Sequence, residues 1–145
     1  MNFDYLEDRI ETINDEAEFM ISLLGHKELK DENGLLTDSG IATMGLHGQR
    51  YNVYMAQADD YAEQIRKLNK ELSSDPYNTN LIERREKMYE LQRKMILAAE
   101  DEKDAIMDLV KDGYDAQLSS MKKLIDEYTN SLDRAKDLYD YMRVE

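Results

Sequence analysis

The chain is interrupted near its midpoint by Ser73-Ser74-Asp75-Pro76-Tyr77-Asn78, a stretch that contains its only proline. Proline has no amide hydrogen to donate within a helix, and it biases the preceding residue, Asp75, away from helical geometry. On both sides of the stretch, apolar residues recur at intervals of three and four, as on one face of a helix, without the sustained alternation of a strand. The stretch therefore predicts a reversal between two helical arms. Helix is expected to resume near Asn80, because Asn80 and Glu83 have the spacing of a capping box.

The two predicted arms, 3–72 and 80–145, have nearly equal length. Equal arms favour an antiparallel pairing, in which the first helix would lie against the end of the chain. In the second arm, the apolar stripe makes a five-residue step between Leu109 and Tyr114, beside Gly113. Such a step is a phase slip, which a helix absorbs by local unwinding or a kink.

A second interruption is predicted over 25–36, where the apolar pattern lapses and Asn33-Gly34 favours a tight turn. Thr37 follows at a position suited to capping the next helix. Together these signals predict an all-α fold: a long antiparallel helical hairpin or coiled coil with breaks near 25–36 and 73–79. We expect 1–145 to form a single elongated helical segment of a longer parent chain.

The apolar positions of the two arms define a predicted interaction seam, the surface through which the helices should contact partners. Its members are Met55, Ile65, Asn69, Leu91, Met95, Leu109, Met121, Ile125, Leu132 and Met142. Asn69 is its polar member, and it is a candidate for setting register or oligomeric state, or else a simple helix-end residue. Because two paired helices bury only a narrow seam, we expect isolated chains to associate with further copies.

The charge is strongly negative, with 19 Lys and Arg against 32 Asp and Glu, a net charge of −13. Asp101, Asp108 and Asp115 recur every seven residues and form a possible acidic edge, either a docking strip for a basic partner or a solvated face. Nucleic-acid binders draw affinity from cationic contacts, so we expect no direct binding of nucleic acid. No apolar stretch approaches the roughly 20 residues of a membrane-spanning helix, so no membrane segment is expected here.

Residues suited to catalysis or metal binding are sparse. The chain has no cysteine, and its two histidines, His26 and His47, lie too far apart for a compact metal-ligand pair. We expect His47 to be an exposed helical residue. No nucleophile or phosphate-binding motif occurs. We therefore expect no catalytic residue, cofactor, metal or small-molecule substrate, and a protein that is not an enzyme.

Residues 36–145 contain five strings that carry a family resemblance. In order, they are Tyr51-Asn52-Val53-Tyr54-Met55-Ala56-Gln57-Ala58-Asp59-Asp60-Tyr61, Asp75-Pro76-Tyr77-Asn78, Leu81-Ile82-Glu83-Arg84-Arg85, Ala98-Ala99-Glu100-Asp101-Glu102-Lys103-Asp104-Ala105-Ile106 and Ala135-Lys136-Asp137-Leu138-Tyr139-Asp140-Tyr141. With these strings the chain resembles a segment of the tail tape-measure proteins encoded by phages and prophages of Gram-positive gut bacteria. Their order and spacing make them more specific than generic heptads.

The resemblance implies a virion structural protein that is made in the bacterial host cytoplasm. Such long helical chains lie in the lumen of the tail tube, contact other tail proteins, set tail length during assembly and leave when the genome is ejected. No catalytic residues carry over from the strings. Family members usually run to many hundreds of residues with membrane-active stretches, so this chain is interpreted as a segment or a truncated relative.

Two alternatives belong to other functional classes. A cytoplasmic bacterial coiled-coil adaptor or scaffold protein would share the heptads without any tail association. A helical enzyme or metal protein would need a pocket in which polar groups converge.

Overall fold

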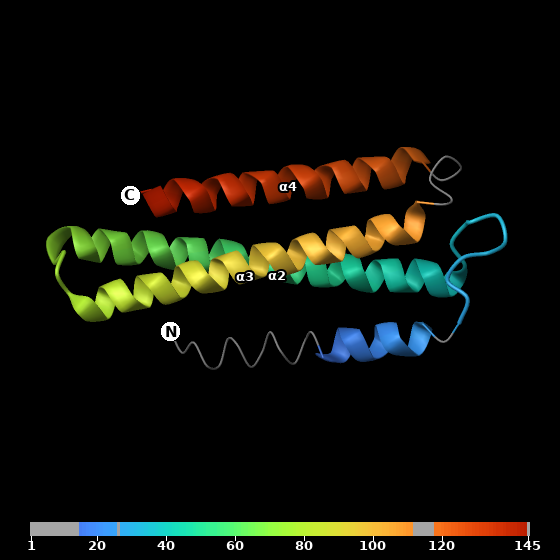
Figure 1. Ribbon diagram of the computed structural model, residues 1–145, viewed down its shortest axis with the longest axis horizontal. Helices are drawn as coiled ribbons and strands as arrows, with labels where there is room; N and C mark the ends of the chain where they lie inside the picture. Colours follow the sequence, from blue (N-terminus) through green and yellow to red (C-terminus); the bar gives the residue numbers. More distant parts are fainter. Residues whose placement is uncertain (1–14, 26, 112–117, 145) are drawn as a thin grey trace. The chain divides into compact units, whose positions relative to one another are not determined.

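The computed structural model describes residues 15–25, 27–111 and 118–144 (Figure 1). Residues 15–24 are helical, and three long helices follow: α2 (Asp38–Ser74), α3 (Thr79–Val110) and α4 (Leu118–Val144). Helix accounts for 86% of the described residues, which contain no strand. The prediction of an all-α fold is confirmed.

The predicted break at 73–79 is present, because α2 ends at Ser74 and α3 begins at Thr79. Asn78 caps α3: its Oδ1 accepts a hydrogen bond of 3.2 Å from the Leu81 amide, and its Nδ2 donates to Asp75 Oδ2 over 2.9 Å. The predicted capping box at Asn80 is therefore wrong. The cap lies two residues earlier because Asn78 is the last residue outside the helix, where a side-chain acceptor can reach the free amides.

The predicted break at 25–36 is also present, as a tight loop before α2. Asp31 Oδ1 accepts hydrogen bonds from the amides of Asn33 (2.8 Å) and Leu35 (3.0 Å). Gly34 has a φ of 79°, which glycine adopts without steric cost. The predicted cap of α2 is confirmed, since the Gly40 amide donates to Thr37 Oγ1 over 3.1 Å.

Gly40 holds this loop against the start of α2. A Cβ added at this position would lie 2.1 Å from the carbonyl oxygen of Leu29, so no larger residue fits without moving the backbone. At Gly45, by contrast, an added Cβ would meet nothing within 4 Å. The close backbone approach is therefore at the first turn of α2, and Gly45 has no such constraint.

Residues 80–145 do not form one continuous arm, and the predicted long hairpin is not confirmed. Helix α3 ends at Val110 and α4 begins at Leu118, so the described chain has two helices here rather than one kinked helix. Gly113 and Tyr114, on which the predicted kink depended, lie outside the described residues.

The chain divides into two compact units. Unit 1 comprises Met1–Arg50 and Glu102–Ile125, and unit 2 comprises Tyr51–Asp101 and Asp126–Glu145. Unit 1 has a small hydrophobic cluster of residues from the loop before α2, the end of α3 and the first half of α4. The cluster consists of Leu36, Leu109, Val110 and Ile125, with Leu29 and Met44 packed against it.

In unit 2, α3 and α4 run antiparallel. Arg143 Nη1 lies 3.1 Å from Glu86 Oε2 near one end of the pairing. Lys136 Nζ lies 2.9 Å from Glu100 Oε2 near the other end. Helix α3 also returns along α2, since Arg85 Nη1 donates to Asn69 Oδ1 over 3.0 Å (Figure 1).

Tyrosines connect the helices of unit 2. The rings of Tyr51 on α2 and Tyr128 on α4 stack with centroids 3.8 Å apart and planes inclined by 19°. The Tyr51 hydroxyl donates to the Tyr128 carbonyl oxygen over 3.0 Å. A second tyrosine contact joins α3 to α4: the Tyr89 hydroxyl donates to the carbonyl oxygen of Met142 over 2.7 Å. The rings of Tyr51 and Tyr89 supply apolar area to the core while their hydroxyls stay hydrogen-bonded.

Candidate functional site

The structure places most of the predicted interaction seam inside the two units. In unit 2 the core buries Ile65, Leu91, Met95, Leu132 and Met142, and in unit 1 the hydrophobic cluster contains Leu109 and Ile125. Met55 and Asn69 are half-buried, and Asn69 is hydrogen-bonded to Arg85. The side chain of Met121 lies outside the described residues. The buried seam positions therefore pack against the chain's own helices, so association between copies would have to use other residues.

The possible acidic edge is exposed where the structure describes it. Asp101, in unit 2, and Asp108, in unit 1, are both exposed, and Asp115 lies outside the described residues. The backbone carbonyl of Asp108 accepts a hydrogen bond of 2.8 Å from Lys30 Nζ. Asp108 therefore helps to hold the loop before α2 through its backbone, while its carboxylate stays at the surface.

Unit 1 contains a polar cluster, which we define as His47, Arg50 and Glu102, around the buried carboxylate of Glu102. Glu102 on α3 is only 6% exposed. Its Oε2 lies 2.6 Å from His47 Nδ1, and its Oε1 lies 3.2 Å from Arg50 Nε. Arg50 Nη2 also lies 3.9 Å from Glu18 Oε1, on the helix formed by residues 15–24. The cluster thus connects three helical segments of unit 1.

The expectation that His47 is an exposed helical residue is wrong, because its side chain is only 15% exposed. His47 and Arg50 are three residues apart and so share one face of α2. That spacing was available in the sequence, but it did not reveal which carboxylate would face the pair. A buried carboxylate such as that of Glu102 is stable only when it is paired, so its contacts with His47 and Arg50 favour one alignment of α2 with α3.

The stacked tyrosines are suited to packing rather than to acid-base chemistry at neutral pH. Burial raises the pKa of Tyr51 above 10.0, although Ser131 and the charge of Arg134 act in the opposite direction. Burial, followed by the negative charge of Glu127, raises the pKa of Tyr128 above 10.0. Both phenols therefore stay protonated well beyond neutral pH.

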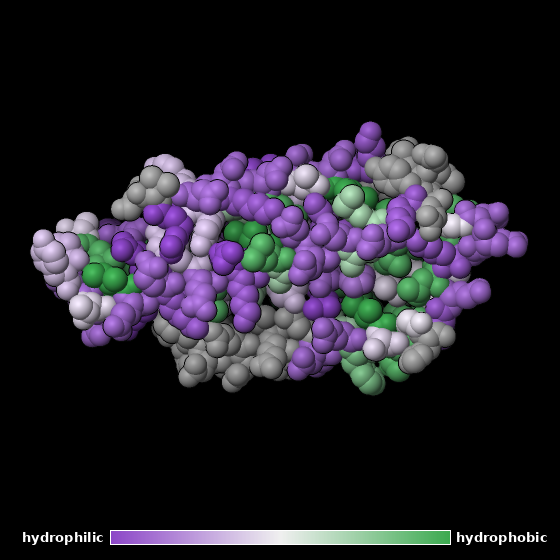
Figure 2. Space-filling model, viewed as in Figure 1, coloured by the Kyte–Doolittle hydropathy of each residue, from purple (hydrophilic) through white to green (hydrophobic). Residues whose placement is uncertain are grey.

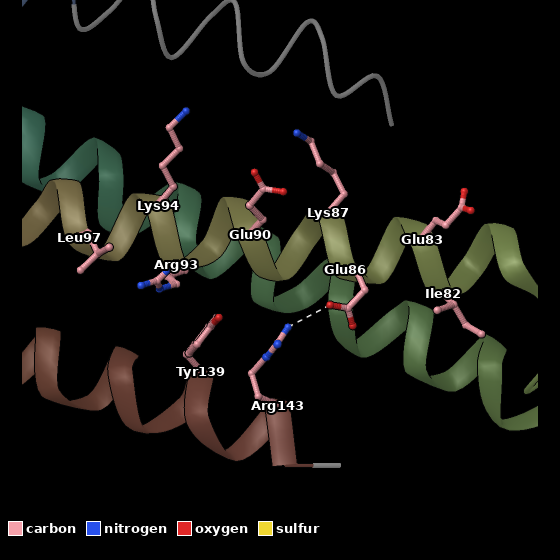
Figure 3. Close-up of a pocket in the computed structure, with 10 residues that line it drawn as sticks. All are labelled: Ile82, Glu83, Glu86, Lys87, Glu90, Arg93, Lys94, Leu97, Tyr139 and Arg143. Atoms are coloured by element: carbon pink, nitrogen blue, oxygen red, sulfur yellow. Dashed lines mark hydrogen bonds and ion pairs between the residues drawn. The ribbon is translucent and has the colours of Figure 1, made fainter.

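The surface of α3 and α4 in unit 2 is hollowed into a groove of about 770 Å³ (Figure 3). One side carries Glu83, Lys87, Glu90 and Lys94, which we call the charged stripe; Figure 3 shows these four side chains pointing away from α4. From α4, Arg143 reaches toward Glu86, and its guanidinium carbon lies 4.8 Å from the centre of the Tyr89 ring. The groove offers charges of both signs beside aromatic and aliphatic surface.

The face of the molecule in Figure 2 is predominantly hydrophilic, with separate hydrophobic patches. Within the described part of the chain, no three His, Asp or Glu side chains lie close enough together to hold a metal ion. None of the described helices is both long enough and apolar enough to span a membrane.

Comparison with protein-family models, with curated proteins and with solved structures finds no match for this chain.

Proposed function

We propose that this chain is a structural, non-enzymatic helical segment of a phage tail tape-measure protein and acts in the tail lumen during assembly. The observation that carries the proposal is the place of the resemblance strings in the structure. Tyr51, Tyr54 and Tyr61, from the first string, are at most 5% exposed in the core of unit 2. Ala99 and Ile106, from the fourth string, are fully buried. The strings thus include residues that hold the long helices together.

The lengths of the helices suit a protein whose residue count encodes a distance. A helix advances about 1.5 Å per residue, so the 37 residues of α2 span about 55 Å. In unit 2, however, α3 returns along α2 and α4 lies antiparallel to α3. A tape-measure segment folded in this way would contribute less length per residue than one continuous helix.

The charge of the chain suits a lumen through which DNA passes. The net charge is −13, and Asp101 and Asp108 are exposed. Like charge disfavours adhesion to the phosphate backbone, so a protein with this surface would not retain the genome.

The test is an in-frame deletion of 37–145 from the parent tape-measure gene, with tail length measured by electron microscopy. As one continuous helix these residues would span about 160 Å, the product of 109 residues and ~1.5 Å. The folded-back helices predict a shortening well below that value, with tubes still assembled. A tandem duplication of the same residues should lengthen the tail by the same amount.

Tails of unchanged length and normal infectivity for both the deletion and the duplication would overturn the proposal. That result would favour the cytoplasmic adaptor instead.

A further inference from the structure

We propose that Asn33 is a site of spontaneous deamidation, and that Asp31 sets the rate of this reaction by holding the surrounding loop closed. Asn33 is exposed, and it is the only asparagine in the chain that precedes a glycine, Gly34. Because glycine has no Cβ, its backbone nitrogen is the least hindered one for attack on a preceding side chain. The proposal rests on unit 1 alone and does not depend on the tail assignment.

The reaction consumes water and releases ammonia, and it needs no enzyme, oxidant or cofactor. The Gly34 backbone nitrogen loses its proton and attacks Asn33 Cγ, and the new N–Cγ bond closes a succinimide ring. The Cγ–Nδ2 bond breaks, and the side-chain nitrogen takes up the proton and leaves as ammonia. Water then opens the ring. Cleavage of the new N–Cγ bond gives aspartate, whereas cleavage of the original peptide bond gives isoaspartate, in which the backbone runs through the side chain.

The loop around this site is a short hairpin closed by Asp31 and Leu35. The Asp31 amide donates to the Leu35 carbonyl oxygen over 2.8 Å, and an antiparallel bridge pairs Lys30 with Leu36. Of the residues between Asp31 and Leu35, only Gly34 has a positive φ, of 79°. This is the expected geometry of a three-residue hairpin loop, in which a type I turn is followed by a left-handed glycine.

The closed loop holds the nitrogen that would attack. The Gly34 amide donates to the Asp31 carbonyl oxygen over 3.0 Å, so it must release this bond before it can turn toward Asn33 Cγ. The Asp31 side chain stabilises the same turn, because its Oδ1 accepts hydrogen bonds from the amides of Asn33 (2.8 Å) and Leu35 (3.0 Å). Deamidation therefore proceeds from the locally opened loop, and its rate follows the opening equilibrium.

Either product would weaken the packing of unit 1. Aspartate at position 33 places a third carboxylate beside those of Asp31 and Glu32, which are both exposed. Isoaspartate lengthens the backbone of the hairpin loop by one methylene. The hairpin brings Leu36 into the hydrophobic cluster of unit 1 and packs Leu29 against it. Deamidation is therefore expected to loosen this contact as the protein ages.

The test incubates the 145-residue chain at mildly alkaline pH and follows each asparagine by peptide mapping with mass spectrometry. We expect Asn33 to be converted faster than any other asparagine of the chain. Its conversion should be at least about fivefold faster in guanidinium chloride than in the folded chain, because the hydrogen bonds that close the loop are then absent. Conversion of another asparagine ahead of Asn33, or equal rates in the folded and unfolded chains, would overturn the proposal.

Two substitutions at Asp31 separate its hydrogen bonds from its charge. Asp31→Ala removes both side-chain hydrogen bonds, so Asn33 should react at least about fivefold faster in the folded state and at an unchanged rate in guanidinium chloride. Asp31→Asn keeps an oxygen that can accept from the same amides and should leave the folded rate close to that of the wild type. Fragmentation within the peptide assigns the modified position, and circular dichroism establishes that both variants are folded. A wild-type rate for folded Asp31→Ala would contradict the role of Asp31, as would equal acceleration by both variants.

The matched control for the effect on unit 1 is Asn33→Gln. The longer glutamine side chain would have to close a six-membered ring, so this variant should stay unmodified at position 33. After the same incubation, the wild-type chain should unfold at a lower denaturant concentration than fresh protein, whereas Asn33→Gln should lose less stability. Equal losses in the two chains would overturn the proposed effect of deamidation on unit 1.

Discussion

At the scale of single residues, the buried carboxylate of Glu102 in unit 1 is stabilised by two neighbouring side chains. One of its oxygens faces His47 and the other faces Arg50, and Glu102 is only 6% exposed. We expect Glu102→Gln to lower the free energy of unfolding by about 3 kcal/mol, because it leaves the Arg50 side chain, 12% exposed, without this carboxylate. Urea denaturation measures the change.

The adjacent substitution Asp101→Asn is the matched control for Glu102→Gln. It also neutralises a carboxylate on α3, but an exposed one, so it should change the stability by less than about 0.5 kcal/mol. Equal effects of the two substitutions would show that burial of Glu102 is not what makes its charge important.

At the scale of elements, two asparagines at the start of α3 have different roles: Asn78 caps the helix and Asn80 does not. Asn78 Oδ1 accepts from the Leu81 amide, whereas Asn80 is an exposed residue within the first turn. We expect Asn78→Ala to lower the free energy of unfolding by about 1 kcal/mol through loss of the cap. Asn80→Ala should be neutral or slightly stabilising, because alanine has the higher helix propensity. Thermal denaturation followed by circular dichroism compares them, and a larger loss for Asn80→Ala would contradict this assignment.

At the scale of the whole molecule, the phenols of Tyr51 and Tyr128 make the free energy of unfolding depend on pH in the alkaline range. The folded state raises the pKa of Tyr51 and Tyr128 above 10.0, so it binds these protons more tightly than the unfolded state does. The resulting stabilisation is fully present below the unfolded pKa and is lost as pH rises through the folded pKa. We therefore expect the free energy of unfolding to fall as pH rises above 10.0.

This pH dependence can be assigned by two phenylalanine substitutions measured in denaturant at several alkaline pH values. Tyr51→Phe should reduce the slope of stability against pH, whatever it does to stability at neutral pH. Tyr77→Phe changes a phenol that is 89% exposed and should leave the slope unchanged. An unaltered slope for Tyr51→Phe would exclude Tyr51 as a source of the pH dependence.

The elements that sequence reasoning predicted correctly are those specified by local rules. Pro76 and the residues around it ended one helix, Asn33-Gly34 marked a tight turn, and Thr37 was recognised as a cap, because backbone geometry and hydrogen bonds to near neighbours decide each of them. The exact cap of α3 was missed. Asn78 and Asn80 have the same side chain, and only the helix boundary distinguishes their roles.

The sequence by itself therefore determined that the described chain is helical and where two of its breaks lie, since these depend on residues within a few positions of each other. Tertiary structure decided what each helix packs against. A spacing of three and four shows that Ile65 or Leu132 lies on a buried face, but it carries no information about which helix covers that face. The pairing of Glu102 with His47 and the stacking of Tyr51 on Tyr128 depend on residues far apart in the chain. Such contacts are decided by how the apolar faces and buried charges of all the helices fit together.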